Sequence, residues 1–432
     1  MNNRTTEAEY LIIGNSAGGI GAAEAIREVN KTSPIIIVTD EPYLAYSRPL
    51  ISEYLSGERT VDEMLFRPAD FYDLNNIELF NGNKAVKLEL DKKAIVIDNG
   101  ERILWKKLLM ATGGNPIVPD IKGLNKRGVF TFLALDNAKA ILGHVNRVKR
   151  AVVIGGGLIG ISVTEALMKL GIQVNVIEMK DRVLNTILDE EASLIVEDFL
   201  KQKGVGIIAN NTISKINGRS SVDSVVLSDG QRISCEMVII AIGVLPRTDL
   251  ALNTAIKVNR GILVDRHMAT SYPDIYACGD TAEAYDFIYN INRVIPVWPN
   301  AYIGGRVAGY NMAGKEVEYP GGTAMNSLNY FGMDIATAGI IATQDSDNYE
   351  VINRIQGDIY QKVILSDDFI VGMVFVGCIE KSGIVFGLMR DRVKVDSFKE
   401  MLLSEDFGLA CLPVELRRER LSAVPQTILN RY

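Results

Sequence analysis

Three closely spaced glycines and one distant acid form the stretch of this chain best suited to holding a ligand. Gly155, Gly157 and Gly160 separate an apolar segment, 151–154, from a helical pattern, and Glu178 ends a second apolar segment. In such a strand–turn–helix–strand unit, the first glycine permits the tight turn and the second lets the backbone approach a pyrophosphate. The third lets the helix pack on the strand. The N–H groups at the helix N-terminus then face the phosphates.

The acid at the end of this unit sets the preference between dinucleotides. A carboxylate at Glu178 accepts hydrogen bonds from the adenosine ribose, and its charge repels a 2′-phosphate. Lys180 and Arg182 follow closely and soften that repulsion. We therefore expect NAD to be favoured over NADP, without strict exclusion of NADP.

The N-terminal region repeats this layout. An apolar strand, 10–13, is followed by Gly14, Ser16 and Gly19 and by a helical stretch to about residue 29; the next strand, 34–38, ends at Asp40 and Glu41. Serine replaces the middle glycine but is still small enough to face a pyrophosphate. Two dinucleotide folds in one chain indicate FAD on the first and NAD on the second. Either Asp40 or Glu41 would contact the ribose of FAD.

Three further segments carry residues suited to a flavin dinucleotide. Arg48 beside Pro49 is a rigidly placed cation that suits a pyrophosphate. Thr112 and Gly113 end an apolar strand with small residues that permit close approach. Asp280 ends the strand that begins near residue 275, where it can bind ribityl hydroxyls, and we expect a helix to follow it with its N-terminus toward the phosphates.

The small residues of the segment 294–312 predict a helix that begins after Trp298 and Pro299. Its glycines allow either a planar ring or another helix to lie against it. From about residue 323 the pattern changes to a hairpin, 360–376, and an amphipathic helix, 379–392. This C-terminal part carries no obvious chemistry, and an interface role is expected.

The composition excludes several other classes of protein. The 432 residues suggest two or three domains, and the net charge of −7 with no basic run argues against nucleic-acid binding. No apolar run reaches the roughly 18 to 20 residues that span a membrane. The polar N-terminus, which leads straight into a strand, argues against a signal peptide. Four well-separated cysteines without a CxxC indicate a reducing cytoplasm and no metal or iron–sulfur site.

In order along the chain, the motifs are the first glycine turn, YSRPLISEYL, ATGG, GGGLIG with Glu178, AIGVLPRTD and IYACGD. Together they resemble the two-dinucleotide flavoproteins of the pyridine nucleotide-disulfide oxidoreductase superfamily. The branch in question contains NADH oxidases, rubredoxin and ferredoxin reductases, and flavin subunits of larger complexes. The resemblance implies an α/β fold: an FAD domain (1–118 and 248–322), an inserted NAD domain (119–247), both Rossmann-like, and a C-terminal α+β interface domain (323–432), often used for homodimerisation.

The resemblance also implies roles for individual residues. Those that would contact FAD are Gly14, Ser16, Gly19, Arg48, Thr112, Gly113 and Asp280; those that would contact NAD are Gly155, Gly157, Gly160, Glu178 and Gly243. Glu53, Trp298 and Ala301 would lie near the flavin ring.

Three departures from the family pattern bear on mechanism. No cysteine lies between residues 1 and 231, so the redox cysteine of the oxidases and coenzyme A disulfide reductases is missing. Glu53 stands where the reductases carry a lysine. Leu158 and Ser162 stand where a tyrosine and a glutamate flank the nicotinamide, so that pocket is expected to be more open.

These features predict an enzyme in which hydride passes from NADH to FAD and electrons go on to an external redox protein. Hydride transfer needs no protein acid or base, which suits a chain with two histidines. Three alternatives stay open: an NAD-reducing FAD subunit of a 2-oxoacid or aldehyde oxidoreductase complex that takes electrons from an iron–sulfur partner, an NADH oxidase that uses O₂, and a non-catalytic, redox-gated flavoprotein.

Overall fold

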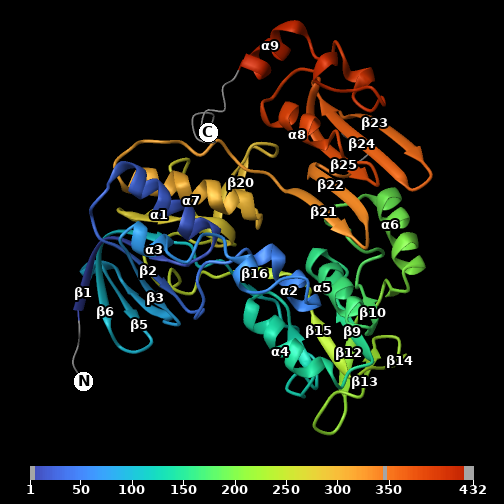
Figure 1. The fold of residues 1–432 in the computed structure, drawn as a ribbon, viewed down its shortest axis with the longest axis horizontal. Helices are drawn as coiled ribbons and strands as arrows, with labels where there is room; N and C mark the ends of the chain where they lie inside the picture. The colour runs from blue at the N-terminus through green and yellow to red at the C-terminus, as the bar shows by residue number, and fades with distance from the viewer. Residues whose placement is uncertain (1–4, 344–347, 423–432) are drawn as a thin grey trace. The chain divides into compact units, whose positions relative to one another are not determined.

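The chain divides into two compact units, each built from two separate stretches of sequence. The structure is a computed structural model that describes residues 5–343 and 348–422. The first unit comprises Met1–Asn115 and Val244–Thr323, and the second comprises Pro116–Gly243 and Ala324–Tyr432. Each unit has its own sheets and its own glycine turn (Figure 1).

A mostly parallel sheet forms the centre of the first unit. Its strands, in order, are β3 (Ile77–Asn81), β2 (Ile35–Thr39), β1 (Thr5–Ile13), β6 (Arg102–Met110), β5 (Ala94–Ile97) and β4 (Ala85–Glu89), and β18 (Ile275–Ala277) pairs with β6. Strands β3, β2, β1, β6 and β18 run parallel, whereas β4 and β5 form an antiparallel extension. The predicted strand at 10–13 therefore begins earlier, at Thr5, because β6 pairs with its whole length.

Two helices pack closely beside this sheet. α1 (Ala17–Val29) and α7 (Trp298–Met312) lie side by side (Figure 1). A Cβ added at Gly305 would lie 2.0 Å from the carbonyl oxygen of Gly18, and one added at Gly309 would lie 2.4 Å from that of Ala22. These two glycines of α7 therefore serve helix packing rather than contact with a planar ring.

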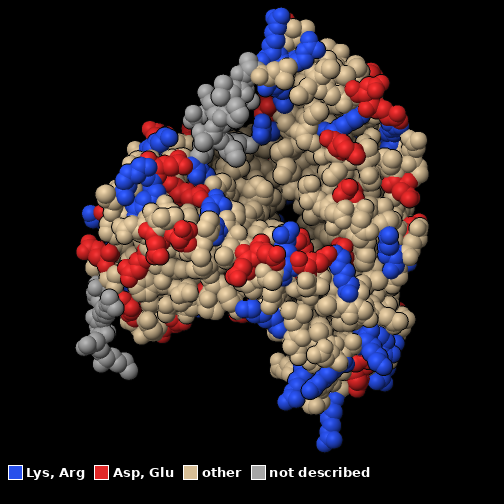
Figure 2. Space-filling view, in the orientation of Figure 1, with Lys and Arg blue, Asp and Glu red and all other residues tan. Residues whose placement is uncertain are grey.

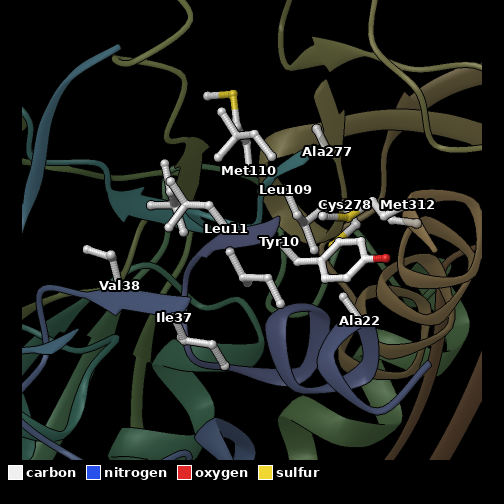
Figure 3. Packing of buried hydrophobic residues seen from close by; sticks show 14 of the residues in the cluster. Tyr10, Leu11, Ala22, Ile37, Val38, Leu109, Met110, Ala277, Cys278 and Met312 are labelled. Atoms are coloured by element: carbon white, nitrogen blue, oxygen red, sulfur yellow. The ribbon is translucent and has the colours of Figure 1, made fainter. Parts of the chain in front are cut away.

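The core of this unit joins strands and helices that are far apart in sequence. Figure 3 shows side chains of β1, β2, β6 and β18 meeting those of α1 and α7. Cys278 lies in this core with its side chain fully buried, and burial raises the pKa of its thiol to about 12. Since the thiolate is the reactive form, this cysteine is chemically inert and acts as a small core residue.

Short elements complete the first unit. They are α2 (Ile51–Ser56), α3 (Phe71–Leu74), β7 (Gly114–Pro116), β16 (Val244–Pro246), β17 (Ile262–Leu263), β19 (Ala282–Asp286) and β20 (Ile291–Val294). The expectation of a helix directly after Asp280 is wrong. A single 3₁₀ turn, Gly279–Thr281, leads into strand β19, because Ala282 and Glu283 pair with β17 and continue the chain as a strand.

The second unit contains a fully parallel sheet in the order β11 (Gly206–Ile208), β10 (Gln173–Ile177), β9 (Arg150–Ile154), β15 (Met237–Ile240) and β8 (Val129–Thr131). Its helices are α4 (Leu135–Val145), α5 (Leu158–Lys169) and α6 (Glu190–Gln202). A small antiparallel sheet of β12 (Ile213–Asn217), β13 (Ser224–Leu227) and β14 (Arg232–Ser234) lies between α6 and β15 in the chain. Its buried residues share a core with β9 and β15.

An antiparallel sheet forms the C-terminal part of the second unit. Its order is β21 (Met325–Tyr330), β22 (Met333–Gly339), β25 (Phe369–Val376), β24 (Ile359–Ser366) and β23 (Glu350–Gln356), followed along the chain by α8 (Ser382–Arg390) and α9 (Val414–Ser422). The predicted hairpin is confirmed as β24 and β25, with Asp367 and Asp368 in the left-handed region at its turn. The predicted helix at 379–392 is α8.

A buried ion pair ties the C-terminal sheet to helix α6 within the second unit. Asp189, which caps the N-terminus of α6, accepts hydrogen bonds from the Tyr360 hydroxyl at 2.6 Å and the Lys362 ammonium at 2.8 Å. All three side chains are buried. Lys362 also donates to the carbonyl of Ile341 at 3.2 Å. Because removing one partner of a buried pair leaves an uncompensated charge, loss of Asp189 or Lys362 alone is expected to destabilise this contact between the sheet and α6.

The surface charge is uneven even though the chain is acidic overall. Figure 2 shows lysine and arginine side chains gathered at the end of the second unit that carries β13 and β14. Five exposed or half-buried cations of this unit, which we call the basic face, lie near one another: Lys122 is bridged to Lys215 and Arg127 to Ser221, and Lys126, Arg219 and Ser220 line one hollow. In the part of the chain that the structure describes, no helix combines the length and apolar character that crossing a membrane requires.

Candidate functional site

Each unit contains a glycine turn at the carboxyl end of its parallel strands. We call the residues around Gly14, Ser16 and Gly19 the first cradle, and those around Gly155, Gly157 and Gly160 the second cradle. Both turns connect a central strand to the N-terminus of a helix, α1 or α5. Ligands in open α/β sheets bind at this edge, so both positions are suited to a dinucleotide.

The two turns are built alike. Gly14 and Gly155 adopt φ values of +120° and +102°, and an added Cβ would lie 2.1 Å from the carbonyl oxygen of Ala111 or 2.4 Å from that of Ala241. The third glycines are also alike. A Cβ on Gly19 would lie 1.9 Å from the carbonyl oxygen of Gly14, and a Cβ on Gly160 would lie 1.9 Å from that of Gly155. These positions therefore exclude any side chain.

The middle positions of the two turns are open. Ser16 and Gly157 cap their helices with extended backbones and make no side-chain capping bond. A Cβ added at Gly157 would meet nothing within 4 Å. The space in front of Gly157 is thus open to a ligand that approaches the backbone, as a pyrophosphate requires.

A hollow of about 350 Å³ adjoins the first cradle. Its lining includes Gly14, Asp40, Thr112 and Arg247. Arg247 donates to Asp40 at 2.6 Å. Burial opposes ionisation of Asp40, but the hydrogen bond and charge of Arg247 outweigh it and hold the pKa of Asp40 below its ordinary value. Asp40 therefore presents an ionised carboxylate to the hollow.

The neighbouring acid, Glu41, is engaged elsewhere. It accepts a hydrogen bond from the Tyr46 hydroxyl at 2.6 Å and forms an ion pair with Arg48. The structure therefore separates the two acids between which the sequence left the choice open. Asp40 lines the hollow, and Glu41 orients Arg48.

The segments that close the first cradle are joined by hydroxyl groups. The Thr112 hydroxyl donates to the carbonyl of Arg247 at 2.6 Å, and Thr281 donates to the same oxygen at 2.9 Å. The amide of Arg247 donates to the carbonyl of Gly113 at 2.9 Å. Arg247 thus holds Thr112 and Gly113 against the turn that contains Asp280.

Arg48 and Asp280 also influence one another. Burial raises the pKa of Asp280, and the charge of Arg48 partly offsets that rise. Burial likewise disfavours the charge on Arg48, but Tyr46, Glu41 and Asp280 together raise its pKa above the ordinary value. A cation held in this way is suited to neutralising a pyrophosphate.

Of the three residues expected near the flavin ring, two lie at the start of α7. The backbone of Ala301 approaches Gly18, and its Cβ would lie 3.3 Å from a Cβ at Gly279. The Trp298 ring packs edge-on against Phe66, with centroids 5.3 Å apart. Glu53, in α2, instead pairs with Arg59, and both side chains are about two-fifths exposed.

In the second cradle the terminal acid is bonded to its own turn. Glu178 accepts from the amide of Gly156 at 2.7 Å and from the amide of Lys180 at 2.7 Å, and it is 8% exposed. Gly243 follows β15, and its carbonyl accepts from the amide of Ile117 at 2.9 Å. These bonds hold the carboxylate beside the glycine turn with lone pairs left for a ribose.

Sequence reasoning missed two residues of these sites. Arg247 lies within the motif AIGVLPRTD, and its position after the inserted fold was an available signal. Tyr330, at the end of β21, donates its hydroxyl to the carbonyl of Leu158 in the first turn of α5 at 3.1 Å. No local signal could have found Tyr330, because 172 residues separate the two partners.

Two Rossmann-like folds, each with a glycine turn, a helix N-terminus and a terminal acid, define a two-dinucleotide oxidoreductase. The chain belongs to the pyridine nucleotide-disulphide oxidoreductase family, whose model matches residues 8–305. The model of the rubredoxin NAD⁺ reductase C-terminal domain matches residues 325–393. Members of this family bind FAD and NAD(H), and the open backbone at Gly157 and the hollow beside Gly14 are compatible with both cofactors.

Individual relatives cover the chain almost completely. An NADH oxidase of Methanocaldococcus jannaschii is 31% identical over 98% of both chains. The epsilon subunit of an NADH-dependent phenylglyoxylate dehydrogenase of Aromatoleum evansii is 26% identical over 95% of this chain and 98% of its own. An assimilatory nitrate reductase electron transfer subunit of Bacillus subtilis is 29% identical over 92% of this chain, which spans only 51% of that relative.

A solved structure is similar along nearly the whole chain. The crystal structure of NADH:rubredoxin oxidoreductase from Clostridium acetobutylicum has a TM-score of 0.74 at 27% identity and covers 91% of this chain and 98% of its own.

Proposed function

We propose that this protein transfers reducing equivalents between NADH and a protein electron carrier by way of FAD. The observation that carries the proposal is the presence of two glycine-turn cradles with no redox-active cysteine beside either among the residues that the structure describes. Cys278 is the cysteine nearest to the first cradle, and its buried thiol is inert. Electrons that reach the flavin therefore leave for an external acceptor.

Each cradle contributes binding and orientation. In the first, Gly14, Ser16 and Gly19 present the helix end to the pyrophosphate of FAD, Arg48 neutralises it, and Asp40 accepts from the ribose; Thr112, Gly113 and Asp280 complete the contacts. FAD, when bound, connects the two-electron chemistry of NADH to one-electron carriers. The proposal is supported by the hollow beside Asp40 and by the charge coupling of Arg48 and Asp280.

The second cradle binds NADH in this proposal, through Gly155, Gly157, Gly160, Glu178 and Gly243. Glu178 accepts from the adenosine ribose and disfavours a 2′-phosphate. The side chain of Arg182 forms an ion pair with Asp181 at 2.7 Å, which reduces its availability to a phosphate. This pairing supports a preference for NADH over NADPH.

The carrier is a small acidic redox protein in this proposal. The basic face around Lys122, Lys215 and Arg219 supports an acidic partner, and the match of residues 325–393 to a rubredoxin reductase domain supports a rubredoxin-like one. We further propose a cytoplasmic homodimer. The four cysteines are all free thiols, in line with a reducing compartment.

The test is anaerobic stopped-flow spectroscopy of the flavin-loaded protein. NADH should bleach the flavin absorbance faster than NADPH does, and oxidised rubredoxin should restore it faster than air does. Absence of bleaching by either nucleotide would contradict the proposal. Rapid, sustained NADH consumption in air without a carrier would indicate an oxidase instead, and slow bleaching with a long-lived reduced state would indicate a redox-gated binding protein.

A second candidate function is the NAD-reducing flavin subunit of a larger oxidoreductase. It is favoured by the full-length relative that is the epsilon subunit of a phenylglyoxylate dehydrogenase. In this role electrons enter from an iron–sulfur partner and leave on NAD⁺. Reduction of NAD⁺ by chemically reduced ferredoxin, much faster than NADH-driven reduction of rubredoxin, would support this direction over the first.

A further inference from the structure

The C-terminal sheet contacts the nucleotide-binding helix of the second cradle directly. The hydroxyl of Tyr330 donates to the carbonyl oxygen of Leu158 at 3.1 Å and accepts from the Ser162 hydroxyl at 3.5 Å. The Tyr330 side chain is 4% exposed. A buried hydroxyl from a distant strand is therefore bonded to the first turn of α5, which begins directly after Gly157.

This bond acts on one particular peptide unit. The carbonyl of Leu158 and the N–H of Ile159 belong to the same planar group, so fixing one fixes the other. The first backbone hydrogen bond within this turn runs from the amide of Ile161 to the carbonyl of Gly157 at 3.0 Å. The Ile159 N–H precedes it and is one of the N-terminal amides that have no intrahelical acceptor. Such amides are the donors that a helix N-terminus offers to phosphates.

The hydroxyl of Tyr330 also strengthens that donor. A hydrogen bond to a carbonyl polarises the peptide group and makes its N–H a better donor. Burial raises the pKa of Tyr330 to about 12, so the hydroxyl keeps its proton at neutral pH.

We propose that Tyr330 is a positioning residue for the nicotinamide dinucleotide, acting through the Leu158–Ile159 peptide on the pyrophosphate. The C-terminal sheet is thus part of the nucleotide-binding machinery as well as a candidate interface. This inference rests on the proposed function only in that the second cradle binds a dinucleotide pyrophosphate.

The test compares Tyr330→Phe with Tyr360→Phe in the flavin-loaded protein. Both changes remove one buried hydroxyl of the same sheet, but Tyr360 contacts α6 rather than α5. Calorimetric titration with ADP-ribose should show Kd rising roughly three- to tenfold in Tyr330→Phe, the range of one buried hydrogen bond, and staying within about twofold in Tyr360→Phe. The KM for NADH should rise with kcat unchanged. Equal losses in both variants would reduce Tyr330 to a structural role and overturn the proposal.

A measurement on the unmodified protein keeps the proposal testable if Tyr330→Phe does not fold. Hydrogen exchange at the Ile159 amide should slow when ADP-ribose binds, and unchanged exchange would overturn the proposal. Failure of the proposed function would look different, because NADH would leave the flavin oxidised while ADP-ribose still protected Ile159. Loss of protection with normal flavin reduction would remove the Tyr330 inference alone.

Discussion

The two cradles share one backbone design but hold their terminal acids in different ways. In the first, Asp40 pairs with Arg247, a side chain more than 200 residues away in sequence. In the second, Glu178 accepts from the amides of Gly156 and Lys180 within its own βαβ unit. The first acid depends on several segments closing around it, and the second is positioned by a single continuous stretch. This difference is what one expects of a retained cofactor and an exchanging one.

The residues that surround the two cradles differ in the same way. The first cradle is surrounded by Arg48, Thr112, Arg247 and Asp280, which come from four parts of the chain and contact or influence one another. The second cradle receives Tyr330 from the C-terminal sheet, and that residue contacts the carbonyl of Leu158 in the first turn of α5. The open face of Gly157 is thus left for a ligand that must enter and leave.

The largest expected effect comes from adding a methyl group to the first glycine of each turn. Gly14→Ala and Gly155→Ala each force a left-handed residue into contact with a carbonyl oxygen, at a cost of about 3 kcal/mol. Gly14→Ala should yield protein without bound flavin, whereas Gly155→Ala should keep the flavin and lose bleaching by NADH. Flavin absorbance per protein after gel filtration measures the first effect, and stopped-flow bleaching measures the second. Loss of flavin from Gly155→Ala would show that the cradles are not independent.

A smaller effect is expected from removing the acid of the second cradle. Glu178→Ala should weaken NADH binding by about 1 to 3 kcal/mol, because ribose hydrogen bonds to a charged acceptor are lost. Anaerobic titration gives the Kd. Asp181→Ala is the matched control, since that exposed neighbour pairs only with Arg182 among the contacts described here, and its NADH affinity should stay within about twofold. Unchanged affinity in Glu178→Ala would mean that the acid does not contact the ribose.

The ion pair of Asp40 in the first cradle should make the free energy of unfolding depend on pH. The folded-state pKa of Asp40 is lowered by Arg247, so the stability it contributes is present above the ordinary pKa of 3.8. It is lost as the pH falls through the lower folded-state pKa. The free energy of unfolding of the natural protein should therefore exceed that of Asp40→Asn at pH 7 and pH 5, and the gap should shrink near pH 3. A gap that persists at pH 3 would contradict the role of the ion pair.

The smallest effect is expected at Glu53. This residue forms a largely solvent-screened ion pair with Arg59, so Glu53→Gln should leave the thermal midpoint essentially unchanged and the rate of flavin reduction within about twofold of the natural value. Arg59→Gln, which removes the other partner, is the control. A change in the rate of flavin reduction that is seen in Glu53→Gln but not in Arg59→Gln would indicate that the Glu53 carboxylate acts near the flavin.

Much of this architecture could be predicted from sequence because it is encoded locally. Glycine spacing, apolar strands and helical periodicity identify both βαβ units, and the hairpin of β24 and β25 follows from its turn residues. The sequence pattern predicts a helix after Asp280, whereas the structure has strand β19 there. This strand is fixed by its pairing with β17, and the residue pattern of one short segment cannot show such a pairing. The contacts of Arg247 with Asp40 and of Tyr330 with Leu158 were missed for the same reason, since 207 and 172 residues separate the partners and only tertiary packing brings them together.

The discontinuity of the first unit has a consequence for how the chain matures during synthesis. Strand β6 ends at Met110, but its partner β18 begins only at Ile275, and α7 follows later still. At roughly 5 to 20 residues per second, about 10 to 30 s pass before the ribosome supplies that partner. The parallel sheet of the second unit is complete by Ile240 and can fold during this interval. The parallel sheet of the first unit is therefore started first but completed after that of the second, and until β18 is made the apolar end of β6 lacks this partner strand.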